Sequence, residues 1–407
     1  MAMIFRPTDE AQVVEVVTWA CGDGVPLEVV GAGSKRALGR PVSCDHVLDL
    51  AALTGVTLYE PAELVLSARA GTPVVEIEAQ LEQHQQLLAF EPGDWGPLLG
   101  APAGAQTIGG VIACNLAGPR RVAAGAARDH FLGVRAVNGR GEAFKSGGRV
   151  VKNVTGYELC KPLAGSYGTL AAMTSVTVKV LPAPQQTLTL AWFGLADVAA
   201  LRRLTTALNS PVEISGAAHL PASIAVRSSV APVAAAGGAV TLVRLEGFAP
   251  SVAHRADTLS ALFGGAQRWD RALSRTLWAE IRDVGVFCGD STPTVWRLSV
   301  PPAAGATVVG AVVARLGADV PAYYDWGGGL IWLAVPGTLA DAGAAAVRAA
   351  LTECGGHATL IRAPEPIRAT VDVFQPQAPA LAALAGRVKD SFDPRHILNP
   401  GRMVPGW

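Results

Sequence analysis

The stretch from Thr107 to Pro182 constrains the fold of this chain more than any other feature. Its glycines stand in pairs at the edges of apolar segments, Gly109 beside Gly110 and Gly165 close to Gly168. A residue without a Cβ lets main-chain N–H groups come within hydrogen-bond distance of a ligand. The spacing therefore predicts a backbone that wraps around a large, flat cofactor.

A second glycine loop, VVGAGSKRALG from Val29 to Gly39, follows a predicted strand near the N-terminus. Its successive N–H groups could form a nest for a pyrophosphate. A Rossmann fingerprint needs glycine where Arg36 stands, and a Walker loop needs G-K-[ST], so neither nucleotide motif fits. Taken alone, the loop is equally a strand-to-helix connection. Beside the later glycine cluster, a cofactor site is the better interpretation.

The composition limits the classes of protein to which this chain can belong. A length of 407 residues favours two domains, or one split domain with an insertion. The charged residues are only 16% of the chain, and 33 basic residues balance 33 acidic ones, which leaves no basic field to attract nucleic acid. The six cysteines lie far apart without a C-x-x-C pair, so we expect neither an iron–sulfur cluster nor a metal site in this chain.

The N-terminal segment and the apolar runs indicate where the protein works. Residues 1–10 carry Arg6, Pro7 and two acids where a signal peptide would need an apolar run, and no later segment offers about 18 uninterrupted apolar residues. We therefore expect a cytoplasmic, soluble protein. Association with the inner face of a membrane would be peripheral and would come through partners.

The element pattern predicts an α+β fold in three parts. Residues 1–182 alternate helices and strands and close with the strand SVTVKVLP, which Pro182 ends. Residues 186–363 include a β-α-β-β-α-β succession, which is typical of a ferredoxin-like antiparallel sheet with helices on one face. Residues 376–407 form a final helix, Ala378 to Ser391, and a tail, after a proline-spaced linker over residues 364–379.

The order of the motifs carries a family resemblance. A glycine loop near residue 31 is followed by T-I-G-G at 107, D-H-x-x-G-V at 129, G-S-Y-G-T-L at 165 and N-P-G at 399. This set resembles the FAD-binding module of the vanillyl alcohol oxidase and p-cresol methylhydroxylase type. The resemblance implies a split FAD-binding module, with the ferredoxin-like domain inserted as a cap and the tail returning to the flavin.

A narrower resemblance spans both halves of the chain. The segments SKRALGRPV, LAGPRR, GGRVVKNVTGYEL, TVWRLSVP, DWGGGLIWL and GGHATLIR are similar to the E subunit of bacterial glycolate dehydrogenase, also called glycolate oxidase. That family implies a subunit that works beside a larger FAD-binding subunit and an iron–sulfur subunit. Such a complex passes electrons from glycolate, a small 2-hydroxy acid, toward the membrane quinone pool.

The resemblance also implies which residues bind the cofactor. The pyrophosphate loop would be formed by Gly31, Ala32, Gly33, Ser34 and Lys35. The ring system and ribityl chain would be lined by Thr107, Gly109, Gly110, Ala113 and Asn115, supported by Gly165, Gly168 and Leu170, with Val176 at the adenine end. The isoalloxazine edge would be met by Asn399, Pro400, Gly401 and Arg402.

Two departures from the family pattern matter. The glycine loop reads S-K-R where relatives with covalent flavin offer a histidine, so we expect FAD to be bound non-covalently. The larger hydroxy-acid-oxidising relatives carry an H-x-G-D-G-N-x-H motif, which binds metal or helps to take the hydroxyl proton, and this motif does not occur here. Substrate oxidation by this subunit itself is therefore left open.

Oxidation of a 2-hydroxy acid would need a cation for the carboxylate and a base for the hydroxyl proton. Arg297 is the best candidate cation, because it lies mid-strand in VWRLSV and shares a face with Ser299. Tyr324 and His357 are further candidates. The alternative interpretation is that Arg297 is a solvated or ion-paired strand residue, that the aromatic residue is core, and that the histidine is structural.

Three functions are therefore considered. The first is an FAD-binding subunit that relays glycolate electrons within a hetero-oligomer. The second is a non-catalytic scaffold that docks the larger flavoprotein. The third is a stand-alone dehydrogenase for a related acid such as D-lactate.

Overall fold

The computed structural model describes residues 3–149 and 156–407. The chain divides into two compact units: the first is Met1–Leu116, Gly125–Ala183 and Pro376–Trp407, and the second is Ala117–Ala124 and Pro184–Gln375. The three domain spans predicted from the sequence stay a prediction. The units differ from those spans in grouping residues 117–124 with the second half. Of the GGRVVKNVTGYEL motif, residues 150–155 lie outside the described residues.

The first unit opens with a helix packed on a parallel sheet. Helix α1, Glu10–Asp23, begins at Asp9, whose side chain accepts from the Gln12 N–H at 2.9 Å, and ends at Gly24 in the left-handed region. Its buried face enters an apolar core with Leu27 and Leu48. The sheet has the order β1 (Met3–Phe5), β3 (His46–Asp49), β2 (Leu27–Val30).

A five-stranded antiparallel sheet forms the rest of the scaffold of the first unit. Its strands lie in the order β4 (Val56–Glu60), β5 (Val65–Arg69), β9 (Ala171–Lys179), β7 (Phe131–Asn138), β8 (Ala143–Gly147). The short strands β6 (Gln86–Leu87) and β10 (Leu181–Pro182) pair separately. The helices of this part are α2 (Val74–Glu82), α3 (Ile108–Cys114), α5 (Ala127–His130) and α6 (Cys160–Leu163).

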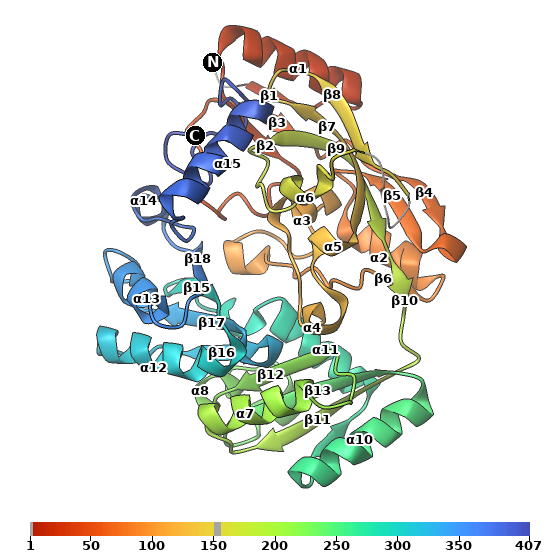
Figure 1. Cartoon of the computed structure of the whole chain (residues 1–407), viewed down its shortest axis with the longest axis vertical. Coiled ribbons are helices and arrows are strands. Elements are labelled where there is room, and N and C mark those ends of the chain that lie inside the picture. The colour runs from red at the N-terminus through yellow and green to blue at the C-terminus, as the bar shows by residue number, and fades with distance from the viewer. Residues whose placement is uncertain (1–2, 150–155) are drawn as a thin grey trace. The chain divides into compact units, whose positions relative to one another are not determined.

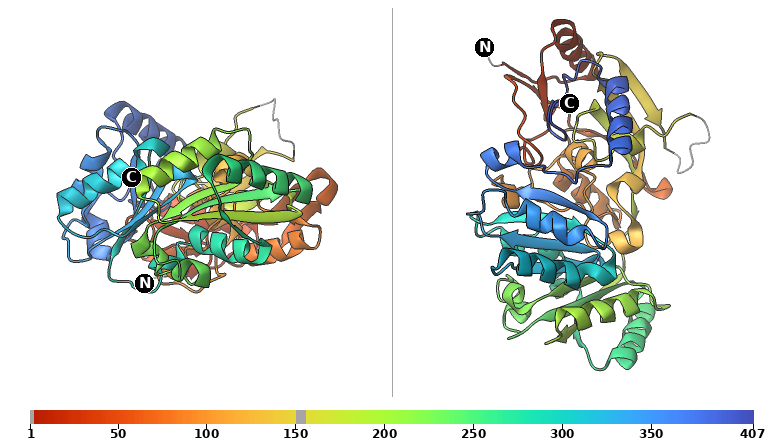
Figure 2. Two further views of the ribbon diagram at one scale, coloured as in Figure 1. Left: turned by 90° about the horizontal axis from the view of Figure 1, so that it is seen from below. Right: turned by 60° about the vertical axis from the view of Figure 1, so that its left-hand side comes forward.

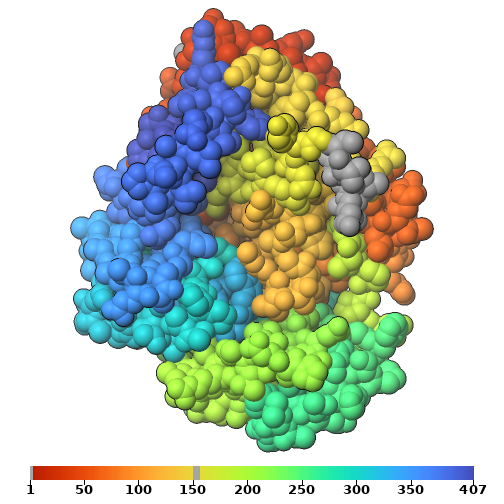
Figure 3. All heavy atoms as spheres, viewed as in Figure 1, coloured from red at the N-terminus to blue at the C-terminus, as the bar shows by residue number. Residues whose placement is uncertain are grey.

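The C-terminal tail returns to the first unit. Helix α15, Pro379–Phe392, lies beside the strands of this unit (Figures 1 and 2), and the Phe392 carbonyl accepts from the Gly139 N–H at 2.9 Å. Beyond α15, Leu398 bridges to Leu27 in parallel. On the face shown in Figure 3, the C-terminal residues in blue lie against the N-terminal residues in red. The tail thus completes the edge of the sheet that β2 begins.

The second unit is built on one antiparallel sheet of eight strands. They lie in the order β14 (Gln267–Trp269), β11 (Gln186–Phe193), β13 (Val240–Gly247), β12 (Gly216–Leu220), β16 (Ala322–Asp325), β17 (Leu330–Val335), β15 (Thr294–Ser299), β18 (His357–Arg362). The predicted β-α-β-β-α-β order is confirmed by the succession β15, α12 (Gly305–Leu316), β16, β17, α13 (Ala344–Leu351), β18.

The two faces of this sheet differ. Leu190, Trp296 and Leu298 point to one face and join the main apolar core, to which α7 (Asp197–Leu208) and α10 (Ala249–Phe263) also contribute. The other face carries α11 (Arg271–Arg282), whose Trp278 Nε1 donates to Thr189 Oγ1 at 2.9 Å. The expectation of helices on one face therefore holds for α12 and α13 but is wrong for the sheet as a whole.

Helix α13 begins at Ala344, because the Asp341 carboxylate accepts from the N–H groups of Gly343 and Ala345 and fixes a turn there. One smaller expectation also needs correction. The predicted linker over residues 364–379 contains α14, Glu365–Thr370.

Candidate cofactor site

The first unit contains a pocket that is partly open to solvent. Residues distant in sequence line it, from the end of β2, from α3, from the start of β9 and from the C-terminal tail. Of the predicted cofactor residues, the lining includes Gly31, Ala32, Gly33, Ser34, Lys35, Thr107, Gly109, Gly110, Ala113, Gly168, Asn399 and Arg402.

The loop after β2 offers main-chain donors to this pocket. Among the residues that the structure describes, none provides an acceptor for the backbone N–H groups of residues 31–35. A Cβ at Gly31 would lie 2.5 Å from Thr107 Oγ1, so only glycine lets the loop approach α3 this closely. Thr107 in turn accepts from the Gly110 N–H at 3.3 Å. Successive free donors of this kind suit a phosphate group.

Lys35 is half-buried and contributes its amine to the pocket wall. Its Nζ lies 3.5 Å from Ser34 Oγ, a contact at the limit of a hydrogen bond. Burial lowers the pKa of Lys35 below its usual value, and the nearby Cys114 and Asp94 oppose this shift. Because burying an ammonium group is costly unless an anion neutralises it, this position favours an anionic ligand.

Arg402 stabilises the glycine loop through hydrogen bonds and an ion pair. Its Nη1 donates to the carbonyls of Arg36 and Leu38, both at 2.9 Å, and its Nη2 pairs with Glu28 at 3.0 Å. Glu28 also accepts from Arg36. The Arg402 guanidinium therefore holds the loop, although the residue also lines the pocket.

Asn399 connects three segments around the pocket. Its Oδ1 accepts from the Val29 N–H at 2.8 Å, and its Nδ2 donates to the Tyr167 carbonyl at 2.7 Å. A Cβ at Gly168 would lie 2.7 Å from the same Nδ2, and Gly168 has a φ of 73°. The amide thus fixes the G-S-Y-G turn against β2.

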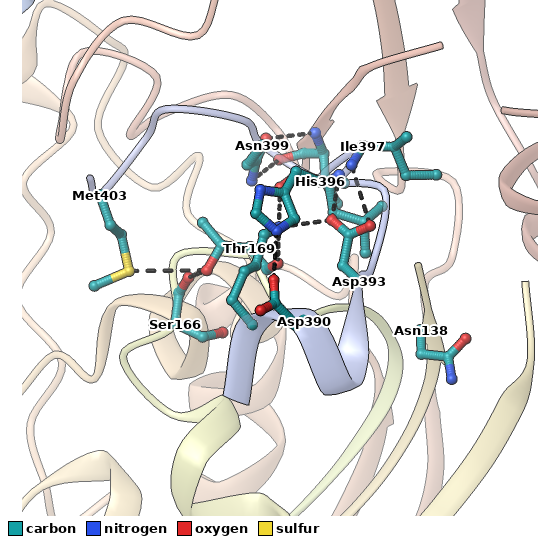
Figure 4. Close-up of polar contacts among 12 residues, drawn as sticks. Asn138, Ser166, Thr169, Asp390, Asp393, His396, Ile397, Asn399 and Met403 are labelled. Atoms are coloured by element: carbon teal, nitrogen blue, oxygen red, sulfur yellow. Dashed lines mark hydrogen bonds and ion pairs between the residues drawn. The ribbon is translucent and has the colours of Figure 1, made fainter. Parts of the chain in front are cut away.

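A buried ion pair holds the start of the tail. Lys389 Nζ lies 2.6 Å from Asp393 Oδ2 and donates to the Thr169 carbonyl at 2.7 Å. The Asp393 carboxylate accepts from the N–H groups of Ile397 and Leu398, at 3.1 and 2.8 Å (Figure 4). These contacts fix the chain just before the N-P-G turn.

Six predicted cofactor residues do not line the pocket and have structural contacts of their own. Asn115 accepts from the Arg128 N–H at 2.9 Å, and the Gly165 N–H donates to Ile112 at 3.2 Å. Leu170 and Val176 are buried apolar residues, and the Gly401 N–H donates to the Trp407 carbonyl. Pro400, between Asn399 and Gly401, belongs to the same turn. Their direct role at a cofactor stays a prediction.

Other residues that line the pocket were not predicted from the sequence. Tyr167, with a φ of 53°, stands between two of the predicted glycines, and this position in the motif could have indicated it. Four others belong to the VVGAGSKRALG loop but were not predicted to line the site: Val29, Val30, Arg36 and Leu38. The rest are apolar or small and carry no motif: Leu50, Ala70, Cys114, Ala171 and Met173.

The structure separates the catalytic candidates of the second unit. Ser299 stands opposite His357 in the β15–β18 ladder, so His357 shares a face with Arg297. Tyr324 points to the other face, in the main core, and its hydroxyl donates to Asp197 Oδ2 at 2.6 Å. Tyr324 therefore does not lie with the other two candidates.

No group of three or more His, Cys, Asp or Glu side chains in residues 3–149 and 156–407 could hold a metal ion. Within the same ranges, no helix combines the length and the apolar character needed to cross a membrane.

Comparisons with known proteins agree with this geometry. Residues 1–147 match a family described as FAD binding domain. Glycolate oxidase subunit GlcE of Escherichia coli (strain K12) is 33% identical over 403 residues, which cover 98% of this chain and 99% of that protein. Glycolate oxidase subunit GlcD of Bacillus subtilis (strain 168) is 25% identical over 54% of this chain and 44% of that protein. The crystal structure of p-cresol methylhydroxylase with substrate bound has a TM-score of 0.73 at 13% identity, covering 99% of this chain and 88% of that chain.

The FAD binding domain and the similarity to glycolate oxidase subunits define an FAD-dependent oxidoreductase, which confirms FAD as the cofactor. Its fold is of the p-cresol methylhydroxylase type, which confirms the predicted fold class. Within this class, the chain belongs to the family of glycolate oxidase subunit GlcE. The family resemblance drawn from the motifs is thereby confirmed.

Proposed function

We propose that this chain is the FAD-binding subunit of a glycolate dehydrogenase complex. In this complex glycolate is oxidised to glyoxylate, and electrons pass through flavin and a partner iron–sulfur subunit toward quinone. The main support is the similarity to GlcE, which covers 98% of the chain and so includes the second unit, where no general flavin motif stands. A larger FAD-binding subunit is the expected second partner, and any contact with a membrane would come through these partners.

The residues around the pocket fit non-covalent FAD. The unpaired N–H groups of residues 31–35 and the Lys35 ammonium would bind the pyrophosphate. Gly110 lines the pocket and adds no side chain to it, which would leave room for the flexible part of the cofactor. When bound, FAD would accept the hydride that leaves the hydroxyl-bearing carbon of the substrate.

Hydride loss from glycolate also requires a group that takes the hydroxyl proton. His357 is the candidate, because burial, followed by Arg297 and Arg121, lowers its pKa, so the ring is neutral near neutral pH and can accept a proton. The missing H-x-G-D-G-N-x-H motif favours a second candidate function, a non-catalytic subunit that stabilises and docks the larger flavoprotein. A stand-alone D-lactate dehydrogenase is the third.

Anaerobic addition of glycolate to the purified, FAD-loaded chain tests these functions. Bleaching of the flavin absorbance by glycolate is the result that we expect for a subunit with its own oxidising site. Bleaching by D-lactate alone would assign the third function. If glycolate does not reduce the flavin of the isolated chain but does so after the partner subunits are added, the chain relays electrons and does not itself oxidise glycolate. Complexes that oxidise glycolate equally well with FAD-free chain would leave only the docking function.

A further inference from the structure

Arg121 belongs to a short segment that is held on the second unit. The segment is Ala117–Ala124, which includes α4 (Arg121–Ala124). Its neighbour Arg120 donates to both carboxylate oxygens of Glu246, at 2.7 and 3.0 Å. The Gly118 carbonyl accepts from Trp326 Nε1 at 3.0 Å. These contacts fix the position of Arg121 although it is exposed.

The Trp326 indole is the common neighbour of two guanidinium groups. The Cζ atom of Arg121 lies 4.6 Å from the centre of the ring, and that of Arg297 lies 5.1 Å from it. Trp326 is only 8% exposed and has a φ of 52°, and its backbone N–H donates to Asp325 Oδ1 at 2.7 Å. A buried aromatic ring held in this rare conformation is a fixed platform for the two arginines.

Two acidic residues and a histidine also lie in this part of the second unit. Glu246 is shared by Arg120 and by Arg244, whose Nε lies 3.7 Å from it, and Asp325 receives the Trp326 N–H. His357 lies on the same sheet face as Arg297. Its pKa is lowered by burial and then by Arg297 and Arg121, as expected for an imidazole beside two cations.

We propose that Arg121, Arg297 and His357 form a binding subsite for a small carboxylate beside Trp326. A guanidinium group binds a carboxylate through two parallel hydrogen bonds, which suits both arginines to this ligand. The choice of a small hydroxy-acid carboxylate, among anions, rests on the proposed function. Sequence reasoning had selected Arg297 and His357 but not Arg121.

Oxalate tests the subsite, because it carries carboxylates of the same size but no carbon-bound hydrogen to lose. Isothermal titration of the FAD-loaded full chain with oxalate should show binding. Arg121→Gln and Arg297→Gln should each weaken it by about tenfold or more. Arg203→Gln is the matched control, because Arg203 also stacks on aromatic rings of this unit, 5.3 Å from that of Trp192. It should leave oxalate affinity unchanged.

A second measurement does not depend on the stability of a variant. In the wild-type chain, an NMR titration of the histidine rings should show the pKa of His357 rising when oxalate is added, because a bound anion offsets the two arginines. The subsite is overturned if oxalate does not bind, if the control loses as much affinity as the two variants, or if the pKa of His357 stays where it was. Oxalate binding that depends on both arginines, without flavin bleaching by glycolate, would contradict the proposed oxidation and leave the subsite standing.

Discussion

At the scale of single residues, Lys35 gives the cofactor site a dependence on pH. Because burial lowers its pKa below the ordinary 10.5, the cofactor-free protein gains stability as pH rises between the lowered pKa and 10.5. FAD phosphates favour the protonated form, so FAD affinity should fall over the same interval. Lys35→Met should weaken FAD binding by about tenfold and abolish this pH dependence. Fluorescence titrations with FAD across the alkaline pH range would measure both effects. If FAD affinity changed with pH equally in the wild type and in Lys35→Met, this role of Lys35 would be contradicted.

Tyr324 and His357 give a second contrast between residues. Tyr324→Phe removes the hydrogen bond to Asp197, which is partly exposed, so we expect the free energy of unfolding to fall by about 1–2 kcal/mol. The rate of flavin reduction by glycolate should not change, because the hydroxyl lies in the main core. His357→Gln should slow reduction by about a hundredfold or more without a comparable loss of stability. Anaerobic stopped-flow traces and urea unfolding curves would test both variants.

At the scale of elements, α15 and the tail close the cofactor site through the Lys389–Asp393 pair. Both side chains are almost fully buried, at 3% and 0% exposed. Lys389→Met would leave the Asp393 carboxylate buried without its cation, so the free energy of unfolding should fall by about 3 kcal/mol. The exposed Lys145 of β8 provides the control Lys145→Met, which should change it by less than about 0.5 kcal/mol. Equal urea midpoints for the two variants would show that the pair does not hold the tail.

The elements also show where sequence reasoning ends. The β-α-β-β-α-β order was readable because each strand is a short apolar run between turn residues. Helix α11 was missed, although its buried Leu277, Trp278 and Ile281 follow helical spacing. The placement of Arg121 in the second unit could not be predicted from the sequence. It depends on non-local contacts, of Arg120 with Glu246 and of Arg121 with Trp326.

At the scale of the whole molecule, the order of the motifs along the chain predicted the cofactor site better than any single motif did. They identified most of the pocket lining, because glycines required for close backbone approach leave a visible pattern, as at Gly31 and Gly168. They could not separate residues that face the pocket from those that shape its walls. Asn115 and Val176 have ordinary structural contacts, and only the folded chain shows this.

The central claim is that the pocket of the first unit binds FAD, and one substitution tests it most directly. A side chain at Gly110 would extend from a position 3.8 Å from Lys35 Nζ, so Gly110→Trp should fill the pocket. Gly310→Trp on α12 is the control, because nothing lies within 4 Å of a Cβ there. The visible absorption spectrum of each purified variant is the measurement. We predict a flavin spectrum for the wild type and for Gly310→Trp and none for a soluble, folded Gly110→Trp; full flavin occupancy in Gly110→Trp would contradict the account.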